Sequence, residues 1–415
     1  MNLKATHRRL LTAAGSWVQR PGARTLRIWQ PVLILLGLAS VTAPAAALDY
    51  QFHGFAAQGF SLSDGNNYFG DSRHGSGNFY ELGLNSTVAI SPDLLVSAQG
   101  ILRRAGRLDT EGLRLDFAQL DYRLLSTTRS NAGLRIGKVK NPYGFFNDTR
   151  DVVFTRPGIV LPESVYYERS GLRSVIFSRE GGQLYGDLAL GEHTVSLSGN
   201  YGLNFDLDAA EKRNLLGSST TLPNDIRVSE FYVARLQDDW NAGRIRLAAS
   251  YLHAAITVQP TPASPIEGRE TASFWLLSAQ YNQPRYSLTG EYVLQYAKAR
   301  SNIAAPFSIA GDGFYLQADY RIQPQWTVVV RYEAAFSNRH DRDGREYAEQ
   351  TGGDRHDRFS HDEMIGLNWS PTQHWGFWAE FHLIQGHSNV GALDNLGRTL
   401  ADRSKLLQLM AAYRF

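Results

Sequence analysis

The chain has 415 residues with 42 basic and 40 acidic side chains, 12% aromatic residues and no cysteine. The lack of cysteine excludes disulfides, thiol catalysis and cysteine-ligated zinc or iron–sulfur sites, and leaves only histidine- or carboxylate-based metal sites open. Beyond the first fifty residues there is no uninterrupted apolar run of 18 residues, so we expect no membrane-spanning helix there.

The N-terminus is typical of a secretory signal peptide. Six basic residues and no acid within residues 1–30 precede the apolar stretch PVLILLGLASVTAPAAA, and we expect cleavage after Ala47. A single membrane anchor is the alternative, but Pro44 interrupts an apolar run that is already short; the long basic segment also leaves the true start codon open. Without residues 1–47, 36 basic side chains face 40 acidic ones, a net charge of −4. The exported chain therefore lacks the basic footprint of a nucleic-acid-binding protein.

From Leu48 onward the hydrophobic pattern has a period of two. In RYSLTGEYVLQYA, for example, Tyr286, Leu288 and Tyr292 share one face, while Ser287 and Glu291 share the other. Such alternation over about ten residues predicts strands with one apolar and one polar face. We expect about sixteen strands, at 50–60, 78–90, 94–104, 113–124, 132–139, 182–190, 193–202, 226–237, 243–255, 271–282, 285–297, 312–322, 326–336, 359–369, 373–386 and 404–415.

The connections alternate between seven tight turns and eight long polar loops, at 61–77, 105–112, 140–181, 203–225, 256–270, 298–311, 337–358 and 387–403. Aromatic residues lie near several strand ends, at Tyr281, Tyr286, Tyr320, Trp326, Trp369, Trp375 and Tyr413, where their rings suit the membrane–water boundary. Because every backbone group must be paired within lipid, a sheet can span a membrane only by closing. We therefore expect residues 48–415 to form one all-β, transmembrane antiparallel barrel with both termini on one rim. A soluble sandwich or propeller would not explain loops that are long on one side only.

The last strand, SKLLQLMAAYRF, places Leu407, Leu409, Tyr413 and the terminal Phe415 on one face. This strand resembles the C-terminal signature of Gram-negative outer-membrane barrels, which implies that Tyr413 and Phe415 form an assembly signal read by the barrel assembly machinery. Sixteen strands with a long third loop resemble the trimeric porin superfamily. The stretch RIGKVKNPYGFFNDTRDVVFTRPGIVLP (135–162) resembles the segment that enters the constriction of phosphate-selective-type porins and porin-like proteins.

The resemblance implies an inward-folded third loop, a homotrimer, and contact with outer-membrane lipid and lipopolysaccharide in a Gram-negative bacterium. The residues expected at the pore constriction are Arg135, Lys138, Lys140, Asp148, Arg150, Asp151, Arg156, Glu163 and Arg169. Those expected on the lumen wall, from the phase of the alternation, are Arg246, Glu291, Asp319, Arg321, Arg331, Glu333 and Glu380. Loop 140–172 also carries two apolar stretches, 152–154 and 159–161, and three prolines, which favour packing against the wall.

The function expected from these features is passive diffusion of small hydrophilic solutes and ions, with a weak preference for anions, because basic residues exceed acidic ones by seven to five over 138–180. The opposite interpretation is that these charges pair with each other and only pin the loop to the wall. A channel specific for phosphate, carboxylate or sugar is the main alternative. A barrel enzyme lacks a nucleophile motif, and a transporter of hydrophobic compounds would need an N-terminal plug. We expect no cofactor and no metal. His340, His356 and His361 of the histidine- and aspartate-rich segment 337–363 could ligate a divalent cation, but their spacing is irregular, and we interpret the segment as a solvated surface loop.

Overall fold

The structure is a computed structural model that describes residues 49–109, 112–170, 172–216 and 223–415. The predicted signal peptide, residues 1–47, lies outside the described residues. The strands are β1 (Asp49–Ser63), β2 (Ser76–Ser91), β3 (Leu94–Ala105), β4 (Leu113–Ser126), β5 (Ser130–Lys140), β6 (Ser178–Leu190), β7 (His193–Gly202), β8 (Phe205–Asp206), β9 (Asp225–Trp240), β10 (Ile245–Gln259), β11 (Gly268–Asn282), β12 (Tyr286–Ser301), β13 (Phe307–Gln323), β14 (Trp326–Phe336), β15 (Phe359–Trp369), β16 (Trp375–Gly386) and β17 (Arg403–Arg414).

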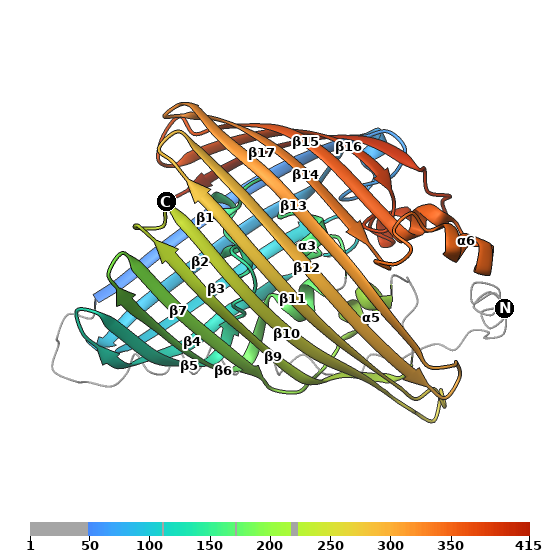
Figure 1. Cartoon of the computed structure of the whole chain (residues 1–415), viewed down its shortest axis with the longest axis horizontal. Coiled ribbons are helices and arrows are strands. Elements are labelled where there is room, and N and C mark those ends of the chain that lie inside the picture. The colour runs from blue at the N-terminus through green and yellow to red at the C-terminus, as the bar shows by residue number, and fades with distance from the viewer. Residues whose placement is uncertain (1–48, 110–111, 171, 217–222) are drawn as a thin grey trace.

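Each strand pairs antiparallel with its neighbours in chain order, and β17 closes the sheet by pairing with β1 over Phe55–Ser63. The two-residue β8 pairs with β9 beyond the end of β7, so the wall has sixteen strand positions, as predicted. At the seam, the backbone N–H of Phe415 donates to the carbonyl of Gly54 at 3.1 Å, and Gly54 donates back at 3.2 Å. The terminal residue therefore takes part in closing the barrel (Figure 1).

The predicted alternation is confirmed in side-chain exposure. On β12 and β13, Leu288 and Leu316 face outward with 48% and 62% of their surface exposed, whereas Glu291 and Tyr315 face inward and are 2% and 1% exposed. The predicted aromatic residues cluster on the rim that carries the short turns, where Trp326 stacks on Trp369 with ring centroids 5.3 Å apart. The outer surface is thus an apolar band bordered by aromatic rings, which suits a lipid environment.

Two features of the strands differ from the sequence-based expectation. The strands of the β9–β13 wall extend further toward the long-loop rim, so the predicted loops 256–270 and 298–311 shrink to 260–267 and 302–306. Here the hydrogen-bond ladder continues after the apolar alternation fades. In β4 the alternation of the sequence indicates a phase slip near Ala118, and the structure has it at Asp116, where the pairing with β3 skips one residue. In a regular strand, Asp116 and Asp121 would point to opposite faces, because one position is even and the other odd. The β-bulge turns both side chains toward the lumen.

The helical segments lie in the long loops. They are η2 (Ser72–His74), η3 (Asn147–Thr149), η4 (Val153–Thr155), α3 (Glu163–Tyr166), α4 (Leu172–Ile176), α5 (Ala209–Leu216), α6 (Arg345–Thr351), η5 (Arg355–Arg358) and η6 (Leu393–Asn395). Helix α6 projects from the rim opposite the C-terminus (Figure 1). None of the helices in the described part of the chain is long and apolar enough to cross a membrane.

Candidate functional site: the third loop inside the barrel

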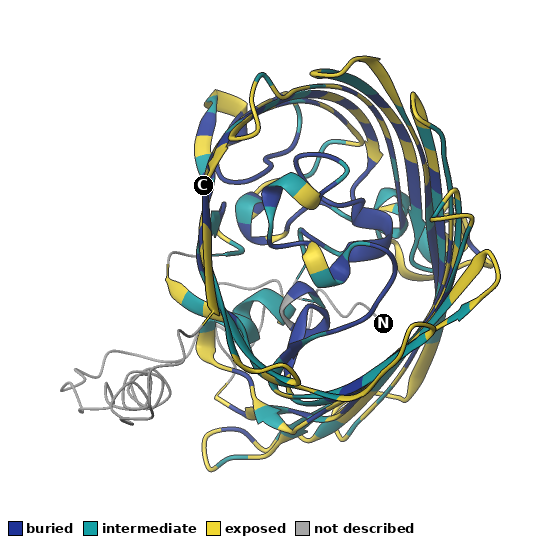
Figure 2. Ribbon diagram, turned by 90° about the vertical axis from the view of Figure 1, so that its left-hand side faces the viewer, coloured by how far each residue is buried: buried dark blue, intermediate teal, exposed yellow. Residues whose placement is uncertain are grey.

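The third loop, residues 141–177, leaves β5 and returns in β6 after passing through the interior of the barrel. Figure 2 looks along the barrel and shows helical turns inside the ring of strands, and α3 is labelled within the barrel in Figure 1. The inward-folded loop predicted from the sequence is therefore present. Its path is a series of single turns: Pro142, Pro157 and Pro162 interrupt it up to residue 162, and α3 is capped by Tyr167, whose φ of +54° is left-handed.

Apolar side chains attach the loop to opposite parts of the wall. Tyr143, Val165 and Tyr166 pack in a buried cluster with inward residues of β9–β13, including Phe274 and Tyr315. A second cluster joins other parts of the loop to β1, β2, β16 and β17; its loop members are Val153, Ile159 and Val160, and its wall members include Phe79, Trp378 and Met410. Most of the two predicted apolar stretches, 152–154 and 159–161, thus lies in these clusters. Since burying one large aliphatic side chain contributes about 1.5–3 kcal/mol, the clusters hold the loop on both sides of the lumen.

Carboxylates of the wall bind backbone amides of the loop. The N–H groups of Phe145, Ile159 and Ser164 donate to Glu291 at 3.0 Å, Glu380 at 2.7 Å and Glu333 at 2.9 Å, respectively. These glutamates lie on alternate strands, β12, β16 and β14, and each is at most 4% exposed. A carboxylate is a strong acceptor for an amide that the chain itself leaves unpaired. The wall glutamates therefore serve as docking points for the loop.

The loop also approaches the wall closely at Gly144. Its φ of +60° is left-handed, and a Cβ atom there would lie 2.8 Å from a carboxylate oxygen of Glu291. Tyr166 donates its hydroxyl to the other oxygen of Glu291 at 2.5 Å. Only a glycine fits this position without displacing the contacts around Glu291.

Glu168 is the centre of a buried ion network. It accepts hydrogen bonds from Arg150 at 2.7 Å, from Arg173 at 3.0 Å and from Arg103 of β3 at 3.3 Å. Burial alone would raise the pKa of Glu168. The opposite effect of the three guanidinium groups is larger, and the pKa falls from 4.5 to about 2. Glu168 is therefore ionised at every physiological pH, and the three buried arginines depend on its charge.

The network reaches the wall on both sides of Glu168. Arg103 also donates to Glu81 of β2 at 2.8 Å, and Arg156 of the loop pairs with the same carboxylate. Further on, Arg173 pairs with Asp151, which in turn accepts from Lys140 of β5 at 3.1 Å. Charges of the loop thus compensate one another or a wall residue, which buried ions require.

The structure places the predicted constriction residues in three settings. Arg150, Asp151, Arg156, Glu163 and Arg169 lie within the docked loop, and each has at most 8% of its side chain exposed. Lys140 and Asp148 lie where the loop meets the wall, Asp148 in an ion pair with Arg235 of β9 at 2.9 Å. Arg135 and Lys138 stand on β5, half-exposed; Arg135 pairs with Asp121 at 2.8 Å.

The predicted wall residues also separate. Glu291, Arg331, Glu333 and Glu380 are buried beneath the loop, Asp319 and Arg246 are half-exposed nearer the short-turn rim, and Arg321 is exposed at that rim, donating to the carbonyl of Pro284 at 3.0 Å.

Several functional residues were absent from the predicted set, chiefly Glu81, Arg103, Asp116, Glu168 and Arg173. The sequence pattern could have identified two of them. Glu81 and Arg103 are adjacent to the outward-facing Leu82 and Leu102, so the alternation predicts that both point into the lumen. The others sit at a bulge or in an irregular loop, where the period of two gives no direction.

Lys138 differs from the other cations of the site. Its ammonium donates to the carbonyl of Leu115 at 2.7 Å and lies 5.6 Å from the centre of the Phe177 ring. Within the described ranges, no carboxylate forms an ion pair with it, whereas Lys140 pairs with two. Lys138 therefore has no direct ion pair in the described part of the chain, and only the more distant carboxylates of Asp116 and Glu180 act on its charge.

Comparison with known proteins gives matches to solved structures alone: no family model and no curated protein matches the chain. OmpT, an outer membrane protein of Vibrio cholerae, superimposes with a TM-score of 0.55 at 12% identity over 89% of this chain and 98% of that one. The outer membrane channel DcaP of Acinetobacter baumannii gives 0.55 at 13% identity over 89% and 97%. The anion-selective porin from Comamonas acidovorans gives 0.52 at 13% identity over 89% and 100%.

These likenesses establish the fold. The chain has the sixteen-stranded, closed antiparallel barrel that these outer-membrane porins and channels have.

Proposed function

We propose that this protein forms a water-filled channel in the bacterial outer membrane, through which small hydrophilic solutes and ions diffuse passively. The observation that carries the proposal is the third loop, which is held at mid-depth inside a closed barrel by wall glutamates and apolar clusters. A fixed loop at that depth narrows the lumen without a moving part, which suits diffusion and has no need of catalysis. The overall likeness to channels and porins supports the same role.

The loop's contacts favour a narrow passage. Beyond β12, β14 and β16, it is bonded to β7 through Asn141 and Asn200, to β9 through Asp148 and Arg235, and to β10 through Gly144 and Ser250 at 3.1 Å. A loop bonded to so much of the circumference leaves less open cross-section than one that hugs a single wall. This observation favours the second candidate, a channel specific for phosphate, carboxylate or sugar, and in either case we expect a low conductance.

A weak preference for anions would depend on Lys138. Most other cations around the constriction are matched by carboxylates, so the excess of basic residues in the sequence is not the charge that a solute meets. One unmatched ammonium beside the loop favours anions slightly, and salt screens it over a Debye length of about 8 Å at physiological strength.

The remaining partners follow from the same proposal. The outward Leu82 and Leu84 of β2 offer an apolar face for a homotrimer, and the trimer form of OmpT, with a TM-score of 0.54, has the same fold. Tyr413 and Phe415, exposed at the short-turn rim, would be read by the barrel assembly machinery after cleavage of residues 1–47. The outer band would contact lipid and the long loops lipopolysaccharide. The mass in mild detergent and the N-terminal sequence of the membrane-inserted protein test these points.

Planar bilayers test the channel itself. We expect stepwise single-channel conductance in potassium chloride, and a small zero-current potential of anion-selective sign in a salt gradient. Lys138→Glu should shift that potential toward cations, whereas Arg129→Glu, the same charge change in an exposed turn outside the lumen, should leave it unchanged. Absence of conductance steps would reject the channel, and equal shifts in both variants would reject the role of Lys138. If one class of anion, such as phosphate, blocks the chloride current at low concentration, the specific channel is the better description.

A further inference from the structure

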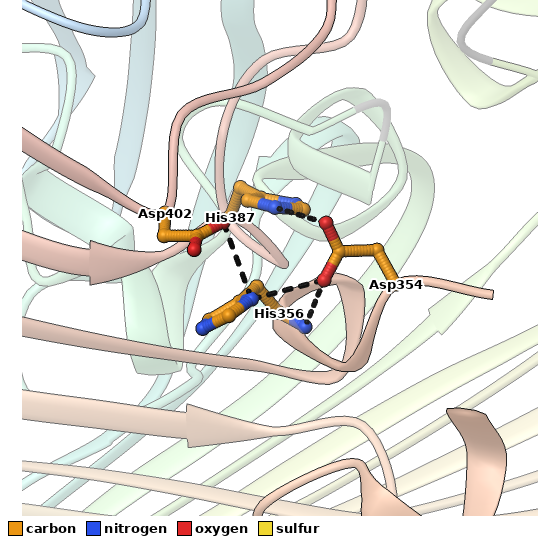
Figure 3. Close-up of side chains that lie close together, drawn as sticks. All are labelled: Asp354, His356, His387 and Asp402. Atoms are coloured by element: carbon orange, nitrogen blue, oxygen red, sulfur yellow. Dashed lines mark hydrogen bonds and ion pairs between the residues drawn. The ribbon is translucent and has the colours of Figure 1, made fainter. Parts of the chain in front are cut away.

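Two neighbouring long loops bring together a cluster of four side chains with metal-binding groups (Figure 3). Asp354 and His356 belong to the loop that connects β14 to β15, and His387 and Asp402 to the loop that connects β16 to β17. One ligand atom from each residue can be chosen so that all four lie within 4.8 Å of one another. The two loops are far apart in sequence, so the cluster exists only in the folded barrel.

The spacing of these atoms fits a tetrahedral ion. His356 Nδ1 lies 2.9 Å from Asp354 Oδ1 and 3.2 Å from Asp402 Oδ1, and His387 Nε2 lies 3.6 Å from Asp354 Oδ2. A zinc ion with bonds of 2.0–2.1 Å to nitrogen and oxygen separates its ligands by about 3.3 Å. These three separations bracket this value, and the other pairs of ligand atoms lie within 4.8 Å, so side-chain rotations would draw the four groups together around an ion.

Hydrogen bonding alone does not satisfy the cluster. Two carboxylates converge on the single Nδ1 atom of His356, and one nitrogen carries at most one proton. His387 is 5% exposed, and within the described structure neither of its ring nitrogens makes a hydrogen bond, although Nε2 is directed toward Asp354. An unpaired polar atom at a buried position is costly. A cation between the four groups would satisfy both histidines at once.

A carboxylate already stands where an orienting partner of a metal ligand belongs. The other ring nitrogen of His387, Nδ1, lies within ion-pair distance of Asp357 Oδ1, at 3.0 Å, in a geometry that does not yet form a hydrogen bond. Histidines that bind metals usually present their second nitrogen to a carboxylate, which fixes the ring and raises its basicity. The backbone supports the arrangement, because His387 N donates to the carbonyl of His356 at 2.9 Å and so holds the two loops together.

We propose that Asp354, His356, His387 and Asp402 form a binding site for a divalent transition metal of the zinc class, which ties the two loops together at the long-loop rim. Two imidazoles and two carboxylates suit zinc, nickel or copper, whereas calcium and magnesium prefer oxygen ligands alone. The sequence predicts a solvated surface loop at 337–363, because the ligands of this site come from two different loops. The site is independent of the proposed channel, since it lies in the loops outside the constriction.

The test is calorimetric titration of the full-length protein, purified without a histidine tag, with zinc chloride and separately with calcium chloride. We expect one equivalent of zinc that calcium does not replace. Asp402→Asn, an isosteric change at an exposed position, should weaken binding at least about 10-fold, and Asp357→Asn should weaken it about 10- to 100-fold through the orientation of His387. His340→Ala, at an exposed histidine of the same loop outside the cluster, is the matched control and should bind normally.

Loop distance provides a second readout that does not depend on how well a ligand variant folds. The chain has no cysteine, so Gln350→Cys and Thr399→Cys, both at exposed positions, give one spin label on each loop. Zinc should narrow the distance distribution between the labels in this protein and leave it unchanged when Asp402→Asn is added. The proposal is overturned if zinc binds no better than calcium, if the His340→Ala control loses as much affinity as Asp402→Asn, or if zinc leaves the distance distribution unchanged.

Discussion

The third loop (141–177) and the loop that follows β14 (337–358) are both rich in charge, yet they lie in opposite environments. The third loop holds four arginines and four acids, and the β14–β15 loop holds five arginines and six acids. Charge content therefore does not decide which loop enters the barrel. The third loop also contains runs of valine, isoleucine and leucine and three prolines, whereas 337–358 contains none of these residue types.

The difference shows that the apolar content of a loop decides whether the loop is buried in the barrel or exposed to solvent. Burial or exposure then determines how much each ion pair contributes to stability. In the third loop, Arg150 and Glu168 are completely desolvated and each depends on the other. In the β14–β15 loop, Arg345 and Asp343 form a pair of similar length, 2.8 Å, with side chains 71% and 48% exposed. Breaking a buried pair leaves an uncompensated charge, while breaking an exposed pair returns both groups to water.

The strongest test of this comparison is Glu168→Gln. The change leaves Arg103, Arg150 and Arg173 without their shared negative charge, so we expect a loss of about 3–5 kcal/mol in the free energy of unfolding. The loop should also detach in part from the wall, which would raise the conductance or make it noisy. Denaturant unfolding in lipid and single-channel recording measure the two effects. Glu349→Gln, the same change in α6, is the control, and an equal effect in both variants would contradict the comparison.

A smaller effect is expected at a docking point on the wall. Glu291 accepts from the amide of Phe145 and from the hydroxyls of Tyr166, Ser278 and Tyr315. Glu291→Gln keeps the shape but replaces an acceptor oxygen by a donor, and we expect a loss of about 1.5–3 kcal/mol. The same unfolding measurement applies. Stability equal to that of the unmodified chain would show that the wall glutamates do not hold the loop.

The sequence was sufficient to predict the strands of the barrel wall and the inward fold of the third loop. A period of two located all sixteen strands, and the apolar stretches within 152–161 indicated a loop packed inside. It did not indicate the partners of the charges: Glu168 meets Arg103 across 65 positions, and nothing local to either residue encodes that contact. For the same reason the sequence indicated a bulge in 113–124 only near Ala118 rather than at Asp116, and did not pair His356 with His387, since each depends on the register between segments.

The pH dependence of the free energy of unfolding provides a third test of the loop. Burial, only partly offset by Arg169, raises the pKa of Glu163 from 4.5 to about 8. The folded chain therefore keeps a proton that the unfolded chain releases near pH 4.5. The resulting stabilisation is complete below that pH and is lost as the pH rises to about 8. Unfolding at pH 5 and pH 9 should show lower stability at pH 9, and Glu163→Gln should reduce that difference. Glu168 stays ionised throughout this range and does not contribute to it. A difference unchanged in the variant would assign the pH dependence to other groups.

The smallest effect is expected in the exposed loop, at Asp343→Asn. The carboxylate of Asp343 lies 2.8 Å from Arg345 and 3.8 Å from Arg355, so a count of contacts would rank it with Asp151, which pairs with Arg173 and Lys140 in the third loop. Exposed pairs contribute about 0–1 kcal/mol and are screened by salt, so Asp343→Asn should change the free energy of unfolding by less than about 1 kcal/mol, and by less still in 1 M salt. Asp151→Asn should cost several-fold more and keep most of its effect in salt, because solvent does not reach the pair. Equal losses in the two variants, or equal sensitivity to salt, would mean that burial is not what separates the two loops.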